Sequence, residues 1–218
     1  MTYEEVRRDT AVNVYIAQAD ASLNALGFTE HSFAHVTRVA EIAGDILEKL
    51  NYPERMVELA KIAGYLHDIG NVVNRIDHSQ SGAVMAFRIL DRMNFPPEEI
   101  AAIVTAIGNH DEGTGVPVNA VAAALFIADK SDVRRSRVRK KADIAQDIHD
   151  RVNYSVTDSR LVIDVERKII ELQLTVDTDV SSVMEYFEIF MKRMLLCRQA
   201  AERLALTFKL AINGQVLV

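Results

Sequence analysis

Six imidazole and carboxylate side chains, spaced far apart, form the most informative chemical pattern in this chain. They are His35, His67, Asp68, His78, His110 and Asp129. Divalent metals of intermediate softness take imidazole and carboxylate groups as ligands. The intervals are 32 residues from His35 to His67, 10 from Asp68 to His78, 32 from His78 to His110 and 19 from His110 to Asp129. A site assembled from separate helices needs such spacing, because each element brings its own ligand. The pattern predicts a metal site.

This prediction depends on the presence of all six residues together, since any one of them alone is usually a surface or helix-capping group. Asp129 directly follows the apolar stretch 122–128, where a carboxylate without a partner would be costly. Adjacent residues of a helix lie roughly 100° apart, so His67 and Asp68 can face one cavity. Asp68 has two carboxylate oxygens and can bridge two metals, whereas a histidine nitrogen binds only one.

Apolar periodicity predicts helices over residues 2 to about 150. The expected segments are 2–27, opened by a Thr2–Glu5 capping box, then 32–50, 55–69, 79–93, 98–109 and 119–132. His35 and Asp129 then lie within helices, His67, Asp68 and His110 at helix C-terminal ends, and His78 in a short loop before a helix. His31 and neighbouring Glu30 could add a further ligand, but we favour a solvated helix start for both.

After about residue 150 the apolar pattern changes from purely helical to a mixture of strand and helix periodicity. Alternation over 170–176 predicts a strand, with 155–164 as its hairpin partner, and 179–205 predicts one long amphipathic helix. Asn213-Gly214 between alternating runs predicts a second hairpin. We expect a mainly α fold, with a helical metal-binding catalytic domain over 1–150. Residues 151–218 would form a small α+β unit that packs on this domain or makes a homodimer contact.

Composition narrows the function classes. The 218 residues are 49% hydrophobic, with mean hydropathy +0.03, which is enough for a sizeable core. No apolar run reaches the length that spans a membrane, and the charged N-terminus does not resemble a secretory signal. The lone Cys197 suits a reducing cytosol, and net charge −6 argues against nucleic-acid binding. We therefore expect a cytoplasmic protein that binds neither membranes nor nucleic acids.

Four motifs carry a resemblance to a known family, the HD-domain metal-dependent phosphohydrolases. They are His35-x-x-Arg38-Val39, Leu66-His67-Asp68-Ile69-Gly70, His110-Asp111-Glu112-Gly113 and Ala128-Asp129-Lys130. The resemblance covers residues 30 to 137 and implies an HD-type helical bundle. It implies one metal held by His35, His67, Asp68 and Asp129. His78 and His110 correspond to the extra histidines of dinuclear members, with Asp68 as the bridge.

Within that superfamily, the stretch from His110 to Arg135 is most similar to the bacterial dinuclear-iron diadenosine tetraphosphatases. The resemblance implies two divalent metals, iron or manganese, and attack on phosphorus by a metal-bound hydroxide. The chain departs from the family pattern in two places. Asn71 stands where many members have a lysine, and the gap from Asp68 to His78 is short, which makes His78 the least secure ligand.

A basic run begins directly after Asp129 and suggests an anionic substrate. Its members are Lys130, Arg134, Arg135, Arg137, Arg139, Lys140 and Lys141. We assign catalytic roles to Asp68 and Lys130, and substrate contacts to Arg75, Lys130, Arg134 and Arg135. A solvated basic face remains an equal alternative for this run.

The expected activity is hydrolysis of a small phosphorylated compound, with nucleotides as the favoured class. The sequence does not distinguish phosphomonoester, diester and anhydride substrates, and no aromatic cluster can be assigned to bind a base. Two alternatives remain: a dinuclear-iron oxygenase of the same superfamily, and a non-catalytic nucleotide sensor or assembly module. The second requires a degraded site, whereas all the core ligands are present in this sequence.

Overall fold

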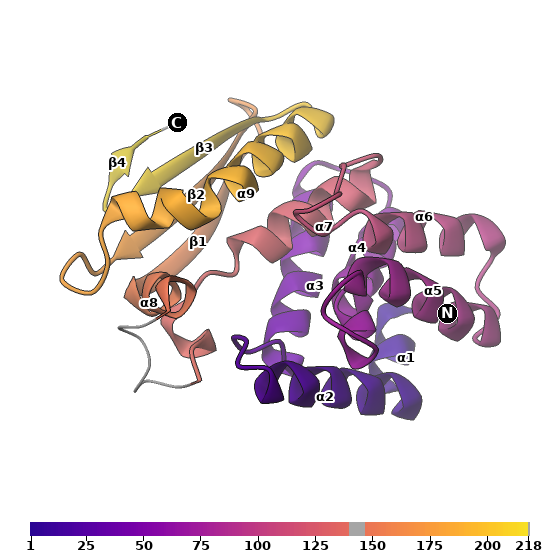
Figure 1. Cartoon of the computed structure of the whole chain (residues 1–218). Helices are drawn as coiled ribbons and strands as arrows, with labels where there is room; N and C mark the ends of the chain where they lie inside the picture. Colours follow the sequence, from indigo (N-terminus) through magenta and orange to yellow (C-terminus); the bar gives the residue numbers. More distant parts are fainter. Residues whose placement is uncertain (140–146, 218) are drawn as a thin grey trace.

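A helical bundle and a smaller α+β unit lie side by side in this computed structural model, which describes residues 1–139 and 147–217 (Figure 1). The bundle contains α1 (Tyr3–Arg8), α2 (Thr10–Ala25), α3 (Phe33–Lys49), α4 (Glu54–Leu66), α5 (His78–Arg92), α6 (Pro97–Gly108) and α7 (Ala120–Ser131). Two short 3-10 turns, η1 (Ile69–Val72) and η2 (Arg135–Arg137), follow α4 and α7.

The centre of the bundle is formed by α3, α4 and α7. Nearly every residue of α7 from Val121 to Ala128 is buried, and four alanines in this stretch allow neighbouring helices to approach closely. Gly64 does the same on α4, because a Cβ there would lie 2.7 Å from the Ala40 Cα of α3. This close approach brings the start of α3, the end of α4 and the end of α7 to one place.

Helix boundaries differ from the sequence-based expectation at two places in the first half. The segment 2–27 is two helices, because Asp9 has extended backbone and its Oδ1 caps α2 by accepting from the Val12 N–H at 3.0 Å. The Thr2–Glu5 capping box on α1 is confirmed. Helix α4 ends at Leu66 instead of residue 69, and the chain then tightens into η1.

Two further elements differ from expectation. His78 is the first residue of α5 and not part of a preceding loop, since Asp77 takes the left-handed conformation (φ 57°) and starts the helix. Helix α8 (Ile148–Ser155) was not predicted, and it spans the boundary that we placed at residue 150. Asp147 caps it by accepting from the His149 and Asp150 N–H groups.

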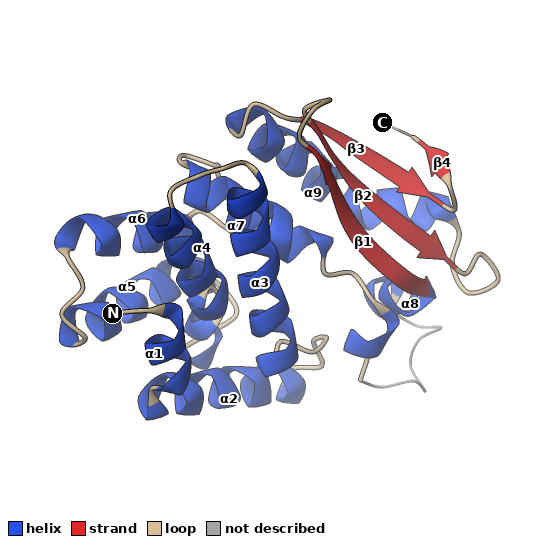
Figure 2. Ribbon diagram, turned by 180° about the vertical axis from the view of Figure 1, so that it is seen from behind, coloured by secondary structure: helices blue, strands red, loops and turns tan. Residues whose placement is uncertain are grey.

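The C-terminal unit has the predicted order of hairpin, long helix and hairpin. Strands β1 (Val156–Asp164), β2 (Ile169–Val176), β3 (Thr207–Ile212) and β4 (Gln215–Val216) form one sheet in that order. Both hairpins are antiparallel, and β2 pairs in parallel with β3 because α9 (Val183–Arg203) crosses between them. Figure 1 shows α9 lying along one face of the sheet, and Figure 2 shows the strands from behind.

The C-terminal unit packs directly on the bundle. Helix α9 contacts α7, the Ser159 hydroxyl donates to the Ser131 carbonyl at 2.6 Å, and Arg38 Nη2 donates to the Ser159 carbonyl at 3.0 Å. The expected contact with a second subunit stays a prediction. None of the helices within the described residues is both long and apolar enough to cross a membrane.

Candidate metal centre

All six side chains of the sequence pattern meet at one point inside the bundle. His35 lies in the first turn of α3, His67 and Asp68 follow α4, and His78 begins α5. His110 follows α6, and Asp129 lies in the last turn of α7. The four histidines and Asp68 are at most 5% exposed, and the Asp129 side chain is 11% exposed. Five helices therefore position one buried polar cluster.

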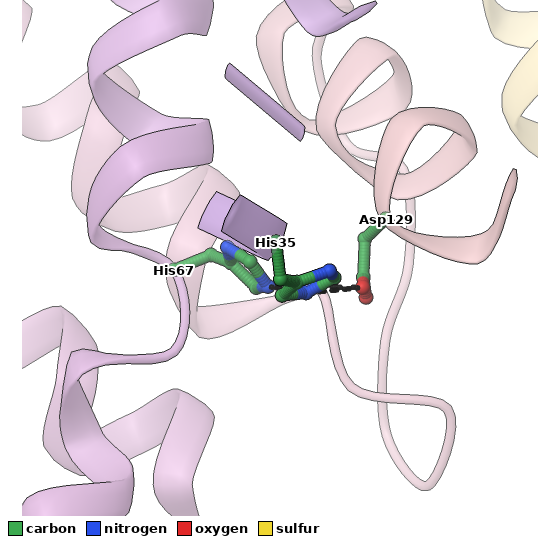
Figure 3. A group of neighbouring side chains, drawn as sticks. All are labelled: His35, His67 and Asp129. Carbon is green, nitrogen blue, oxygen red and sulfur yellow. Dashed lines mark hydrogen bonds and ion pairs between the residues drawn. The ribbon is translucent and has the colours of Figure 1, made fainter. Parts of the chain in front are cut away.

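The first half of this cluster contains His35, His67 and Asp129, whose side chains point toward one another (Figure 3). The two imidazole Nε2 atoms lie 3.3 Å apart, and Asp129 Oδ1 lies 3.4 Å from His35 Nε2 and 3.7 Å from His67 Nε2. Asp68 joins this group through Oδ2, which lies 3.1 Å from His67 Nε2 and 3.6 Å from His35 Nε2.

The second half contains His78 and His110. Their Nε2 atoms lie 3.1 Å apart. Asp68 faces them with its other oxygen, since Oδ1 lies 3.5 Å from His78 Nε2 and 3.8 Å from His110 Nε2. The two oxygens of one carboxylate thus point to two different pairs of imidazoles.

The Nδ1 atoms of the four histidines show why the Nε2 atoms face inward. His67, His78 and His110 each donate Nδ1–H to a backbone carbonyl, of Gly64 at 2.8 Å, Arg75 at 3.0 Å and Ile107 at 2.6 Å. A carbonyl oxygen only accepts, so each Nδ1 carries the proton. In the neutral ring, Nε2 then has its lone pair directed at the centre, which is the arrangement of metal-binding histidines.

The fourth ring is oriented by a residue that sequence reasoning did not assign. His35 donates Nδ1–H to Asp132 Oδ2 at 2.7 Å, and Asp132 is fully buried. Arg38 Nε lies 3.0 Å and Arg134 Nε 2.7 Å from Asp132 Oδ1, so this carboxylate is held as an anion. The signal in the sequence was its place one helical turn after Asp129.

Asn71 has a related role at Asp68. Its side-chain amide donates to Asp68 Oδ1 and to the Asp68 carbonyl, each at 2.9 Å. The residue that departs from the family pattern therefore orients the central carboxylate.

The spacing of these atoms fits divalent cations. Ligand atoms about 2.1 Å from one ion and at right angles to each other lie about 3 Å apart. The inward-facing nitrogen and oxygen atoms within each half are 3.1 to 3.8 Å apart. Two imidazole lone pairs at such a distance repel each other unless a proton or a cation lies between them. The site therefore contains two buried His/Asp clusters of the kind that holds a divalent metal: His35, His67 and Asp129, and His67, Asp68 and His110. His78 adjoins the second cluster through His110.

Electrostatics also favour positive charge at this point. Burial lowers the pKa of His67, but the Asp68 and Asp129 carboxylates outweigh it and raise that pKa to about 10. Burial would raise the pKa of Asp68, yet the histidines around it, His67 first, hold the pKa well below its usual value. Both carboxylates remain anionic and attract a cation.

A cavity of about 330 Å³ opens onto the cluster. Two of the predicted substrate-binding residues, Arg75 and Lys130, line it. Lys130 Nζ lies 2.7 Å from Asp129 Oδ2, and Arg75 stacks over the Phe28 ring with its guanidinium 5.6 Å from the centroid. Phe28 lines the cavity as well, so an aromatic ring is available there that the sequence analysis did not assign.

Arg134 and Arg135 do not line this cavity, so the structure does not bring them together with the other predicted substrate-binding residues. The chain turns away at η2, where Arg134 pairs with Asp132 and Arg135 pairs with Asp177 at 3.0 Å. Lys140 and Lys141 of the same basic run lie outside the described residues.

Other residues take the place of this pair. Arg137 and Arg193 line the cavity, and Arg193 is supplied by α9 of the C-terminal unit. Helix α8 and its N-cap add Asp147, His149, Asp150 and Asn153. Local periodicity cannot show that this distant unit forms one wall of the cavity.

His31 corrects a further expectation, since it is not part of a solvated helix start. Its side chain is 12% exposed, and its Nε2 lies 4.0 Å from Asp68 Oδ2. The ring donates Nδ1–H to the Thr29 carbonyl at 2.7 Å, as three of the cluster histidines do to theirs. Glu30 is also buried in part, and its carbonyl accepts from Arg137 Nε at 2.9 Å.

Two known proteins are similar to this chain. A curated relative, the uncharacterized protein MJ1020 of Methanocaldococcus jannaschii, is 27% identical over 163 residues, or 64% of this chain. The chain spans 62% of that relative's length. The crystal structure of a predicted HD superfamily hydrolase from an uncultured Thermotogales bacterium matches with TM-score 0.47 and 25% identity. The match covers 60% of this chain and 73% of the crystallised chain.

The family model described as HD domain matches residues 32–143, just over half of the 218 residues. That span begins at the N-cap of α3 and includes every one of the six side chains that converge between the helices. The chain therefore belongs to the HD domain family.

Proposed function

We propose that this protein is a metal-dependent phosphohydrolase that acts on a small phosphorylated compound, with nucleotides as the favoured substrate class. His35, His67, Asp68 and Asp129 would hold one divalent metal, and Asp68, His78 and His110 a second. The observation that carries the proposal is the placement of the two Asp68 oxygens. One lies 3.1 Å from His67 Nε2 and the other 3.5 Å from His78 Nε2.

Bound divalent cations would supply Lewis-acid activation of water and would neutralise charge on a phosphoryl group. The imidazole-rich donor set favours iron or manganese over magnesium. The chain's own residues have the complementary tasks. Asp132 and Asn71 fix the orientation of His35 and Asp68. Lys130, which lies next to Asp129, is placed to neutralise a phosphoryl oxygen at the same point.

The charge of the cavity makes substrate binding depend on metal. Among the described residues, its lining contains six carboxylates against four lysine and arginine side chains. Two divalent cations would add positive charge beside these carboxylates. A phosphorylated substrate should therefore bind more tightly to the metal-loaded protein.

The rest of the cavity suits a compact organic phosphate. Its volume of about 330 Å³ lies in the range of small-molecule sites. Arg75 and Phe28 form a stacked pair at one wall, and Asp147 and Asn153 provide oxygen acceptors at another. An aromatic surface, cations and acceptors together match the base, phosphate and hydroxyl groups of a nucleotide.

The test is a screen of nucleotides and dinucleoside polyphosphates with iron, manganese and cobalt. Phosphate release and oxygen consumption should be measured side by side, since the second would reveal an oxygenase. We expect metal-dependent phosphate release that Asp68→Ala abolishes, because this change removes an oxygen from each half of the cluster. Asp91→Ala, at an exposed position near the end of α5 and outside the cavity lining, serves as the control and should retain turnover. Oxygen consumption without phosphate release would contradict the proposal.

A further inference from the structure

A second cavity, of about 560 Å³, lies between the bundle and the sheet. We call it the seam cavity, and its lining includes Arg38, Arg134, Arg135, Ser136, Tyr154 and Asp158. Strand β1, which supplies Asp158, is one of the two edge strands of the sheet (Figure 2). The seam cavity shares no lining residue with the cavity over the metal centre.

The described lining of the seam cavity contains three arginines and one carboxylate, Asp158, although the protein as a whole carries net charge −6. The arginines also form ion pairs with carboxylates outside the lining, namely Asp132, Glu30 and Asp177. The Asp158 carboxylate is itself engaged, since Arg160 Nε lies 2.7 Å from Asp158 Oδ2. The basic run that follows Asp129 thus lines a cavity, but a different one from the cavity that the sequence suggested.

Each of the three guanidinium groups is held in place by the fold. Arg135 donates from Nε to the Tyr154 carbonyl at 2.6 Å and lies 4.5 Å from the centroid of the Tyr154 ring. Arg134 donates to Asp132 at 2.7 Å and to the Ser136 hydroxyl at 2.7 Å. Arg38 donates to the Ser159 carbonyl at 3.0 Å. Cations fixed in this way lose little conformational freedom when they bind an anion.

Two of the three arginines keep donors for a ligand. Arg38 Nη1 and Arg135 Nη1 have no hydrogen-bond partner within residues 1–139 and 147–217. The side chains of Arg38 and Arg135 are 40% and 37% exposed, so a small molecule can reach them. The hydroxyls of Ser136 and Thr157 stand at the same wall.

We propose that the seam cavity is a second binding site that takes a phosphate-bearing anion, either inorganic phosphate or the phosphate group of a nucleotide. Planar guanidinium groups bind phosphate oxygens by paired, charge-assisted hydrogen bonds. Carboxylates outnumber arginine and lysine side chains in the described lining of the cavity over the metal centre, and the reverse holds in the seam cavity, so we expect an anion to favour the seam cavity in the metal-free protein. This inference goes beyond the proposed function and does not depend on it.

The experiment uses the full chain after metal removal with a chelator, titrated at low salt with inorganic phosphate and, separately, with AMP. Calorimetry or phosphorus NMR should show saturable binding of at least one of the two. The probe that binds more tightly identifies the source of the phosphate group. Arg135→Gln should weaken binding about tenfold or more, the loss expected for hydrogen bonds to a charged group.

Two further variants keep the proposal falsifiable if Arg135→Gln unfolds. Ser136→Asp, at an exposed position, adds a carboxylate beside Arg134 and should abolish binding with every arginine still present. Arg193→Gln, in the cavity over the metal centre, should leave binding unchanged. The proposal fails if the metal-free protein shows no saturable binding. It also fails if Ser136→Asp binds as the wild type does, or if Arg193→Gln removes binding.

Discussion

The imidazole of His35 donates its Nδ1 proton to the buried carboxylate of Asp132 at 2.7 Å. The ring has few alternative orientations, because its Nε2 is also 3.4 Å from Asp129 Oδ1. Asp132 is held in turn by Arg38 and Arg134. The orientation of one predicted metal ligand therefore depends on a residue that does not itself face the cavity.

We expect Asp132→Asn to lower metal affinity 10- to 100-fold, the usual loss when the partner of a ligating histidine is changed. The amide oxygen can still accept from Nδ1, but it lacks the charge that makes His35 a stronger ligand. Metal titration of the folded variant measures this, and excess metal should restore part of the activity. Asp164, at the end of β1 with its side chain 40% exposed, provides the control, as Asp164→Asn should leave affinity unchanged.

His78 was the least secure ligand in the sequence, and its placement yields a sharp prediction. Its Nε2 lies 3.1 Å from His110 Nε2, in the half of the cluster away from His35. We expect about two metals per chain in the wild type and about one in His78→Ala, because His35, His67 and Asp129 are untouched. Elemental analysis after desalting measures this. An unchanged metal count would remove His78 from the ligand set.

The convergence of the six side chains was predictable because they are spread over five helical segments and have unambiguous ligand chemistry. Periodicity located those segments, and small errors in their ends did not matter. The orientation of Arg134 and Arg135 was not predictable, since it depends on the turn at η2 just after α7. A basic run carries no signal for such a turn.

Contacts between distant parts of the chain could not be predicted from the sequence either. Arg193 lines the cavity because α9 packs on α7. Helix α8 has only eight residues and follows a polar stretch, so its periodicity is too short to detect. The two hairpins could be predicted because each has its own alternation and turn, whereas the parallel pairing of β2 with β3 that joins them into one sheet was not predicted.

Close helix packing behind the cluster can be tested at Gly64. A Cβ there would lie 2.7 Å from the Cα and 2.8 Å from the N of Ala40, backbone atoms that cannot move without separating α3 from α4. We expect Gly64→Ala to lower the free energy of unfolding by about 1–3 kcal/mol. Metal affinity should fall as well, because the Gly64 carbonyl orients His67.

Gly108→Ala is the matched control for this change. A Cβ at Gly108 meets its nearest neighbour, the Ala83 Cβ, at an ordinary 3.6 Å. This variant should be neutral or stabilised by up to about 1 kcal/mol, the helix preference of alanine over glycine. Chemical denaturation compares the two variants, and equal stabilities would contradict the close-packing account.

Cys197 should be inert in the folded protein. Burial in α9 raises the pKa of its thiol to about 12, so the reactive thiolate is scarce at neutral pH. A thiol reagent at pH 8 should label the native chain at the rate of unfolding and label the denatured chain at once. Rapid labelling of native protein would show that this helix face opens.

Arg193 is the residue through which the C-terminal unit should act on substrate. Its guanidinium lies 2.7 Å from Glu112 Oε1, and Glu112 in turn lies 3.5 Å from Lys130 Nζ. This places a cation from α9 beside the cation that contacts Asp129. We expect Arg193→Gln to raise KM roughly tenfold, the loss of a charge-assisted contact, and to change kcat little.

The matched control is Arg198→Gln, since Arg198 lies on the same helix but is exposed and contacts only Glu202 among the described ion pairs. It should leave both constants unchanged. Steady-state kinetics at saturating metal separate the two effects, and thermal melts exclude unfolding. A fall in kcat at constant KM would instead place Arg193 in the chemical step, and no effect at all would mean that the C-terminal unit only packs against the site.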